Sequence, residues 1–253
     1  MDKTIYVALN AMQTLKTDMR INAQNLANVN VPGFRADTQI SRGSTFLEAA
    51  EQLSTRVFQR QTTETSFSEN SGTLTNTDQP LDLSIVGKGY FYVQTGNDEV
   101  GLSRRGDMQL NTERLLVNGA GQRVLNDSLQ PINIPSYEDI VINELGEIFI
   151  KPAGSEEAER IQVGTIGSIA NPNVSLIKAA SGVIKPSGDI DLPKPNQTAK
   201  IGQGQLETSN VSSIGELINS LENQRKIEMV TKFIKTAKEI DESGTRLLRM
   251  PGS

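Results

Sequence analysis

The sequence Gln24-Asn-Leu-Ala-Asn-Val-Asn-Val-Pro-Gly-Phe-Arg35 marks the point where the N-terminal part of the chain changes character. No Pro or Gly precedes Pro32 and Gly33, so the residues before them can form one long helix. Pro32 disfavours helical geometry at Val31, and Gly33 tolerates a left-handed conformation. The motif therefore predicts a helix that ends here, after which Phe34 re-enters an apolar site.

Upstream of this motif, apolar residues recur at alternating steps of three and four, the heptad spacing that gives a helix a narrow apolar stripe. The stripe consists of Ile5, Ala8, Met12, Leu15, Met19, Asn22, Leu26 and Val29. The amides Asn22, Asn25 and Asn28 recur every three residues, and such amides can bond to a neighbouring helix and fix its register. This pattern suits a repeated assembly.

A second long helix is predicted near the C-terminus, because Gly215 and Gly244 are the only helix breakers between Gln205 and Met250. Its heptad stripe consists of Ile218, Leu221, Met229, Phe233, Ile240 and Leu247, and Ile227, Val230, Ile234 and Ala237 add apolar area on another side. The two helices could pair within one chain as a hairpin. We expect instead that their stripes contact other subunits, because terminal helices flanking a separate domain have little else to bury against.

The middle of the chain contains nearly all glycines and prolines, with short β-branched or aromatic runs between turn dipeptides, which predicts a β-sandwich or irregular barrel. The predicted strands are Leu81–Val86, Tyr90–Gln94, Met108–Leu110, Leu115–Val117, Ile132–Ile134, Ile140–Ile142, Ile148–Ile150 and Ile161–Ile166. Before them lies a polar connector with a weak helical patch at Phe46, Leu47 and Leu53.

The predicted fold class is therefore α+β: a mainly-β irregular central domain flanked by long N- and C-terminal coiled-coil-forming helices that pair in the assembly. The predicted limits are 1–35 for the N-terminal helix, 36–70 for the connector, 71–203 for the β-rich central domain and 204–253 for the C-terminal helix.

The composition excludes much of catalysis. The 253 residues include no His, Cys or Trp, which removes Ser-His-Asp and Cys-His nucleophiles, imidazole or thiolate metal sites and disulfides. A net charge of −5 without basic runs argues against nucleic-acid binding. The longest apolar run, near Leu83–Val86, is far too short to enter a membrane as a span, and residues 1–7 do not resemble a cleavable signal peptide.

Other candidates for chemistry have simpler interpretations. Gly87-Lys88-Gly89 lacks the spacing of a phosphate loop and is better explained as a turn between strands. Asp78 with Asp82, or the acidic residues of 156–159, are better explained as solvated loop charge. Arg104-Arg105 with Asp107 could lie at a subunit contact, although exposed ion pairs of this kind are common. We therefore expect no catalytic, cofactor-binding or metal-binding residue.

Four blocks together resemble the flagellar rod and hook proteins, the bacterial axial family. They are Asn25-Leu-Ala-Asn-Val-Asn-Val-Pro-Gly-Phe34, the stretch from Gly72 to Phe91, Ser103-Arg-Arg-Gly-Asp-Met-Gln-Leu-Asn111, and Gly204-Gln-Leu-Glu-Thr-Ser-Asn-Val211. The blocks occur in the family's order across nearly the whole chain. The motif residues that carry the resemblance at the two ends are Asn25, Asn28, Pro32, Gly33, Phe34, Ser209, Asn210 and Val211.

The resemblance implies a non-enzymatic subunit of the flagellar rod, which carries torque across the periplasm. Within the family, the start of the chain and its length are similar to proximal rod subunits more than to distal ones. The family implies export by the flagellar type III apparatus without a cleaved signal, with the rod cap, other rod proteins and further copies of the chain as partners. A distal rod subunit, a carboxylate-based hydrolase and a non-flagellar secreted β-rich coiled-coil module are the alternatives.

Overall fold

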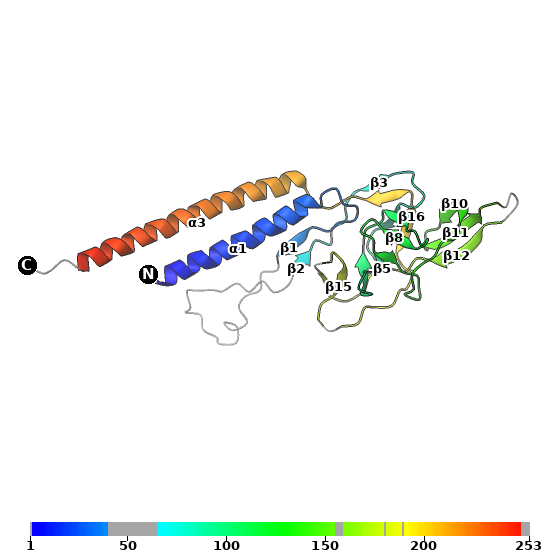
Figure 1. Cartoon of the computed structure of the whole chain (residues 1–253), viewed down its shortest axis with the longest axis horizontal. Coiled ribbons are helices and arrows are strands. Elements are labelled where there is room, and N and C mark those ends of the chain that lie inside the picture. Colours follow the sequence, from blue (N-terminus) through cyan, green and yellow to red (C-terminus); the bar gives the residue numbers. More distant parts are fainter. Residues whose placement is uncertain (1, 40–64, 155–158, 180, 189, 249–253) are drawn as a thin grey trace, which may run out of the picture. The chain divides into compact units, whose positions relative to one another are not determined.

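The computed structural model describes residues 2–39, 65–154, 159–179, 181–188 and 190–248, with one long helix near each end of the chain (Figure 1). Helix α1 (Asp2–Ala27) ends shortly before the predicted stop. In the turn that follows, the Val31 N–H donates to Asn28 O at 3.1 Å, and Gly33 adopts a left-handed φ of 66°. Pro32 and Gly33 therefore lie where the sequence predicts the chain to leave the helix.

Helix α3 (Ser213–Leu248) begins directly after Ser212. The Ser212 Oγ accepts a hydrogen bond from the Gly215 N–H at 3.2 Å, so this serine satisfies one of the free donors in the first turn. Glu216 lies in the same turn, where a negative charge is favourable next to the helix N-terminus. The second predicted helix is therefore present as well.

The chain forms two compact units. Unit 1 comprises residues 1–27, 38–65 and 212–253, and unit 2 comprises residues 28–37 and 66–211. Residues 28–35 and 204–211, which the sequence analysis assigns to the terminal segments, are thus part of unit 2. The weak helical patch at Phe46, Leu47 and Leu53 lies outside the described residues.

Within unit 1, α1 and α3 run antiparallel and contact each other (Figure 1). Near the end of α1, Asn25 Nδ2 donates to Glu216 Oε1 of α3 at 3.0 Å. The facing row of α3 is at least half-buried and repeats at steps of three and four; it consists of Glu216, Ser220, Asn223, Ile227, Val230, Ile234 and Ala237. Each helix therefore covers one side of the other within a single chain.

This arrangement corrects the predicted fold class. The division into a β-rich centre and two terminal helices holds, so the protein is α+β. The described residues contain only these two helices, however, and they form no long coiled coil. The expectation that the helices find no partner in their own chain is wrong, because α1 and α3 present matching half-buried rows to each other.

The β-structure consists of many short strands. They are β1 (Asp37–Gln39), β2 (Thr65–Phe67), β3 (Leu74–Asn76), β4 (Leu83–Val86), β5 (Tyr90–Gln94), β6 (Val100–Ser103), β7 (Met108–Leu110), β8 (Leu116–Asn118), β9 (Arg123–Val124), β10 (Tyr137–Ile142), β11 (Glu147–Pro152), β12 (Ile161–Thr165), β13 (Ser168–Ile169), β14 (Leu176–Lys178), β15 (Ile184–Pro186), β16 (Lys200–Gln203) and β17 (Gln205–Glu207). The largest sheet has the order β14-β15-β6-β5-β9-β8-β7, and β13 also pairs with β5. A second sheet is β10-β11-β12, and β16-β4, β17-β3 and β1-β2 form two-stranded pairs.

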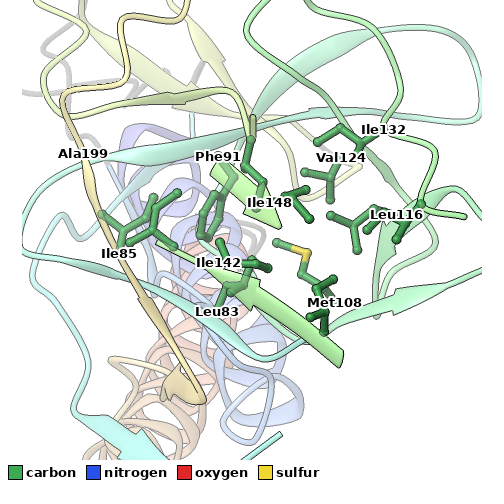
Figure 2. Packing of buried hydrophobic residues seen from close by; sticks show 14 of the residues in the cluster. Leu83, Ile85, Phe91, Met108, Leu116, Val124, Ile132, Ile142, Ile148 and Ala199 are labelled. Atoms are coloured by element: carbon green, nitrogen blue, oxygen red, sulfur yellow. The ribbon is translucent and has the colours of Figure 1, made fainter. Parts of the chain in front are cut away.

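Strand β5 separates two hydrophobic clusters, which explains its continuous apolar sequence. Phe91 packs into the larger cluster with Leu83 and Ile148, as Figure 2 shows from close by. Its neighbours in sequence, Tyr90 and Tyr92, point to the opposite face and pack into the second cluster. The late strand β16 adds Ile201 to the first cluster, so the core of unit 2 needs residues close to the C-terminal helix.

One predicted strand is wrong. Residues 132–134 form no named strand and contribute only one isolated bridge, between Asn133 and Leu115; Pro131, just before them, forms another with Leu125. Ile132 and Ile134 are nevertheless buried in the larger cluster. Buried and exposed residues alternate here, and this alternation shows only that one side of the segment is buried. Both a strand and an irregular extended segment can have that pattern.

Six turns of unit 2 share one five-residue geometry. The first residue pairs with the fifth, and the fourth donates to the first and has a left-handed φ. The turns begin at Thr95, Asn111, Asn118, Asn126, Asn143 and Ala179. In each asparagine turn, the side-chain oxygen accepts hydrogen bonds from the N–H groups of the third and fifth residues.

The turn at Ala179 has this backbone geometry without the asparagine side chain. Replacing Ala179 with asparagine is therefore expected to stabilise unit 2 by about 0.5–1.5 kcal/mol, since two further hydrogen bonds can form. Urea unfolding of the full chain measures the change. Asn118→Ala is the opposite control, with an expected loss of about 1–3 kcal/mol because Asn118 is buried. Equal stability of Ala179→Asn and the parent chain would contradict this explanation of the turns.

Candidate functional site

The family motifs from the two ends of the chain meet in unit 2. The Gly33 N–H donates to Glu207 O at 2.7 Å, and the Asn210 N–H donates to Phe34 O at 3.2 Å. The Asn210 side chain accepts from the Ala36 N–H at 2.7 Å through Oδ1. The segments that connect unit 2 to unit 1 on either side are thus hydrogen-bonded to each other.

Asn210 also holds a third segment in place. Its Nδ2 donates to Ser68 O at 3.2 Å and to Asn70 O at 2.7 Å, so every polar atom of the amide has a partner. Next to it, Ser209 Oγ accepts from the Val211 N–H at 3.2 Å, which stabilises the turn toward α3. Of the predicted motif residues, Gly33, Phe34, Ser209, Asn210 and Val211 therefore share one junction.

A buried charge cluster lies at the centre of this junction. Glu207 forms an ion pair with Arg35 at 3.0 Å and accepts a hydrogen bond from Arg104 Nε at 2.8 Å. The exposed fractions of the three residues are only 2–4%. Glu207 Oε1 also accepts from the Gly72 N–H at 2.9 Å. One carboxylate thus pairs with two guanidinium groups, and these three side chains together carry one excess positive charge.

Backbone carbonyls complete the environment of Arg104. Its guanidinium donates to Gly89 O at 2.9 Å, Gly87 O at 2.9 Å and Ile85 O at 3.2 Å. Burial lowers the pKa of the Arg104 side chain, and the charge of Glu207 opposes that shift. The loop around Lys88 therefore directs carbonyl oxygens toward a cation. A phosphate loop would direct N–H groups toward an anion, so this geometry excludes that function for the loop.

A second buried ion pair holds the segment around Phe34. Lys178 Nζ donates to Asp37 Oδ1 at 2.8 Å and to Arg35 O at 2.9 Å, and it lies 3.6 Å from the centre of the Phe34 ring. Burial lowers the pKa of Lys178, while the hydrogen bond to Asp37 acts in the opposite direction. Phe34 thus enters a site formed by a cation and the surrounding backbone.

The predicted helix stripes lie in two different environments. In α1, Met12, Leu15, Met19, Asn22 and Leu26 are half-buried, and Asn25 is fully buried. In α3, the predicted stripe is exposed: Ile218, Leu221, Met229, Phe233 and Ile240 each keep at least half of their surface accessible. The side chains of Ile5 and Leu247 lie outside the described residues. Asn28 and Pro32, the remaining motif residues, are half-buried.

Sequence reasoning missed the residues that matter most at the junction. Arg104 and Arg105 were treated alike, yet Arg104 is buried, whereas Arg105 forms a partly exposed pair with Asp107 at 2.7 Å. Glu207 lies in a polar block and gave no sign of burial. Arg104 and Glu207 are 103 residues apart, so no local pattern could connect them.

Two further findings concern chemistry and membranes. Among the described residues, no group of three or more acidic side chains is placed to hold a metal ion. In the same part of the chain, neither helix combines the length and the apolar character that crossing a membrane requires.

Comparison with known proteins defines the class. Residues 5–35 match the family model for flagella basal body rod protein, residues 84–171 match the flagellar hook protein FlgE/F/G D1 domain, and residues 203–247 match the flagellar basal body rod FlgEFG protein C-terminal model. All three models describe proteins of the flagellar rod or hook. Each region contributes one member of the charge cluster, Arg35, Arg104 and Glu207 respectively.

The chain belongs to the flagellar basal-body rod protein family, as the sequence resemblance predicted. It is 30% identical over 250 residues to the flagellar basal-body rod protein FlgF of Caulobacter vibrioides, with 98% of each chain covered. FlgF of Escherichia coli is 26% identical, with 99% of this chain and 100% of the relative covered. FlgG of Buchnera aphidicola from Schizaphis graminum is 28% identical and covers 94% of this chain and 96% of the relative.

Proposed function

We propose that the chain is a non-enzymatic structural subunit of the proximal flagellar rod and that it joins other rod subunits through the exposed side of α3. Its place is then the flagellar basal body, where the rod crosses the periplasm. Full-length similarity to FlgF proteins supports the rod assignment. Export through the flagellar type III apparatus and contact with the rod cap during assembly are part of the same proposal.

The observation that carries the proposal is the apolar surface of α3. Ile218, Leu221, Met229, Phe233 and Ile240, which we call the exposed α3 face, lie on the side of the helix opposite the row that faces α1. Full burial of such side chains is worth about 1.5–3 kcal/mol each, and much of that gain is still available here. A monomer gains nothing from this surface, whereas a subunit packed among others would bury it.

The junction in unit 2 suits a subunit that carries mechanical force. Both segments that leave unit 2 toward the helices are held by Glu207 and Asn210, which bond to Gly33 and Ala36 respectively. A force applied to either segment is therefore shared with the other through buried hydrogen bonds and ion pairs. Torque transmission needs such stiff connections between the helices and the outer parts of a subunit.

Phe233→Glu tests the proposal. The variant is expected to fold normally, because Phe233 is half-exposed, but to be lost from purified basal bodies and to abolish swimming, since an unpaired buried carboxylate costs several kcal/mol. Gln224→Glu is the matched control, because it adds the same charge at an exposed α3 position outside the face. Normal incorporation of Phe233→Glu would refute the proposed contact surface.

A distal position in the rod is the second candidate, because FlgG relatives also match 94% of the chain. Complementation separates the two positions. Rescue of motility in a strain that lacks FlgF, without rescue in a strain that lacks FlgG, is the expected result. Rescue only in the strain that lacks FlgG would instead assign the protein to the distal rod.

A further inference from the structure

A polar cluster joins α1 to α3 at one end of the helix pair. Asn25 Nδ2 donates to Glu216 Oε1 at 3.0 Å. In the orientation that satisfies both ends of its amide, Asn22 donates to Glu216 Oε2 at 3.1 Å and accepts from Asn223 Nδ2 at 3.2 Å. Asn25 and Asn223 are buried. We infer that these four side chains, the register cluster, fix the axial alignment of α1 against α3.

The rest of the contact does not distinguish one alignment from another. Beyond the register cluster, the facing positions of α1 are Ala8, Met12, Leu15 and Met19, and those of α3 are Ile227, Val230, Ile234 and Ala237. Both rows repeat at steps of three and four. A slip by seven residues, about 10.5 Å along the axis, that moves Leu15 from Ile227 to Ile234 therefore replaces apolar neighbours with other apolar neighbours, whereas the opposite slip moves Leu15 to Ser220.

The register cluster does distinguish these alignments. A slip by seven residues in one direction would place Glu216 level with Asp18, where a second carboxylate replaces the amide donors. The opposite slip would carry Glu216 past Ala27, the last residue of α1. A buried polar group without partners is strongly disfavoured. Each of the two shifted alignments should therefore be populated roughly tenfold or more below the native alignment.

A single alignment matters for a subunit that must fit a regular assembly. The exposed α3 face is presented at one axial position only if α3 cannot slide along α1. Buried polar residues are a well-attested means of specifying register between helices, at some cost in stability. The effect on assembly rests on the proposed rod function, whereas the alignment itself can be measured on the isolated chain.

Engineered disulfides can measure the register, because the chain contains no natural cysteine. Counting equal steps from the contacts of Asn22 places Leu15 level with residues 223–230 of α3. Leu15→Cys with Ile227→Cys therefore reports the native alignment. Leu15→Cys with Ser220→Cys, or with Ile234→Cys, reports a slip by seven residues in either direction, since a disulfide requires close Cα atoms.

In the parent sequence, only the Leu15–Ile227 pair is expected to form a disulfide under mild oxidation. With Asn22→Leu, Asn25→Leu and Glu216→Leu, a shifted pair should gain yield by roughly tenfold while the helical circular dichroism is retained. The control Glu222→Leu with Gln224→Leu adds apolar side chains at exposed positions and should keep the native pair alone. Glu216→Gln should also keep it, because its amide oxygen still accepts a bond from Asn25.

Two results would overturn the inference. One is ready formation of shifted disulfides in the parent chain. The other is an unchanged preference for the native pair in the triple leucine variant, which would assign the register to the chain connections at 28–32 and 211–212. If the triple variant loses its helical signal, Asn25→Asp replaces it: two facing carboxylates should reduce the native disulfide yield roughly fivefold or more, and an unchanged yield would equally refute the inference.

Discussion

Glu207→Ala is expected to destabilise unit 2 by about 3–5 kcal/mol, the cost typical of removing one partner from a buried ion pair. Most of this cost comes from the positive charges that remain buried without compensation. Without Glu207, the guanidinium groups of Arg35 and Arg104 would stay buried in the same region without the carboxylate that pairs with both. The Gly72 N–H would lose its acceptor as well.

Urea unfolding followed by tyrosine fluorescence measures this effect in the full chain. Three of the four tyrosines, Tyr90, Tyr92 and Tyr137, lie in unit 2, and the chain has no Trp, so the signal reports mainly on that unit. Asp107→Ala is the matched control. It removes a carboxylate from a partly exposed pair with Arg105, with an expected cost of about 0–1 kcal/mol.

Similar losses for Glu207→Ala and Asp107→Ala would show that burial of the cluster is unimportant. If Glu207→Ala does not fold, Glu207→Gln keeps the shape and one acceptor while removing the charge. This variant should unfold at a lower urea concentration than Asp107→Ala. A midpoint equal to that of the parent chain would argue against the electrostatic explanation.

The helix limits and several central strands follow from local sequence. Pro32 disfavours helical geometry at Val31, and α1 ends at Ala27, shortly before it. The prediction of Tyr90–Gln94 as a strand agrees with β5. Elements of this kind can be predicted because the conformational preference of each residue, or of its immediate neighbours, is enough to indicate them. The four family blocks could be recognised because each is a continuous stretch of sequence.

The pairing of faces could not be predicted. Helix α3 has two apolar sides, and periodicity alone does not tell which side faces α1 and which remains exposed. The sequence favoured Met229 and Phe233 as the principal stripe, yet the side with Ile227 and Val230 is the one that packs within the chain. That side also carries Glu216, whose hydrogen-bond partner Asn25 is 191 residues away in the sequence.

The junction shows the same limit for polar residues. Arg35 and Glu207 are charged residues in polar surroundings, and such residues are usually exposed. Their burial follows from the fold of unit 2, which brings Gly72 and Arg104 to the same place. The glycines of the junction are the one local indication of it in the sequence, because a glycine in a motif often marks a place where two backbone segments come close together.

Gly33→Ala tests that close approach and is expected to be among the most damaging single substitutions in unit 2. Two costs add at this position. A left-handed φ of 66° costs a residue with a side chain about 1–2 kcal/mol. In addition, a Cβ atom at residue 33 would lie 2.1 Å from Arg104 O and 2.8 Å from Arg105 N, both of which are backbone atoms.

Backbone atoms cannot turn away as a flexible side chain can, so the segment around Gly33 would have to move. Such a movement would stretch the 2.7 Å hydrogen bond from the Gly33 N–H to Glu207 O and disturb the ion pair of the neighbouring Arg35. The clash should therefore add about 2 kcal/mol or more to the conformational cost, as is usual for overpacking in a rigid site.

Gly121→Ala separates these two costs. Gly121 has a similar left-handed φ of 76°, but nothing lies within 4 Å of the position that a Cβ atom would take. This control should lose only the conformational part, about 1–2 kcal/mol, in the same urea experiment. The difference between the two alanine variants then measures how tightly the N-terminal motif is held against Arg104. Equal losses would mean that the junction yields at no cost, and a junction that yields could not connect the two chain segments stiffly enough to transmit torque.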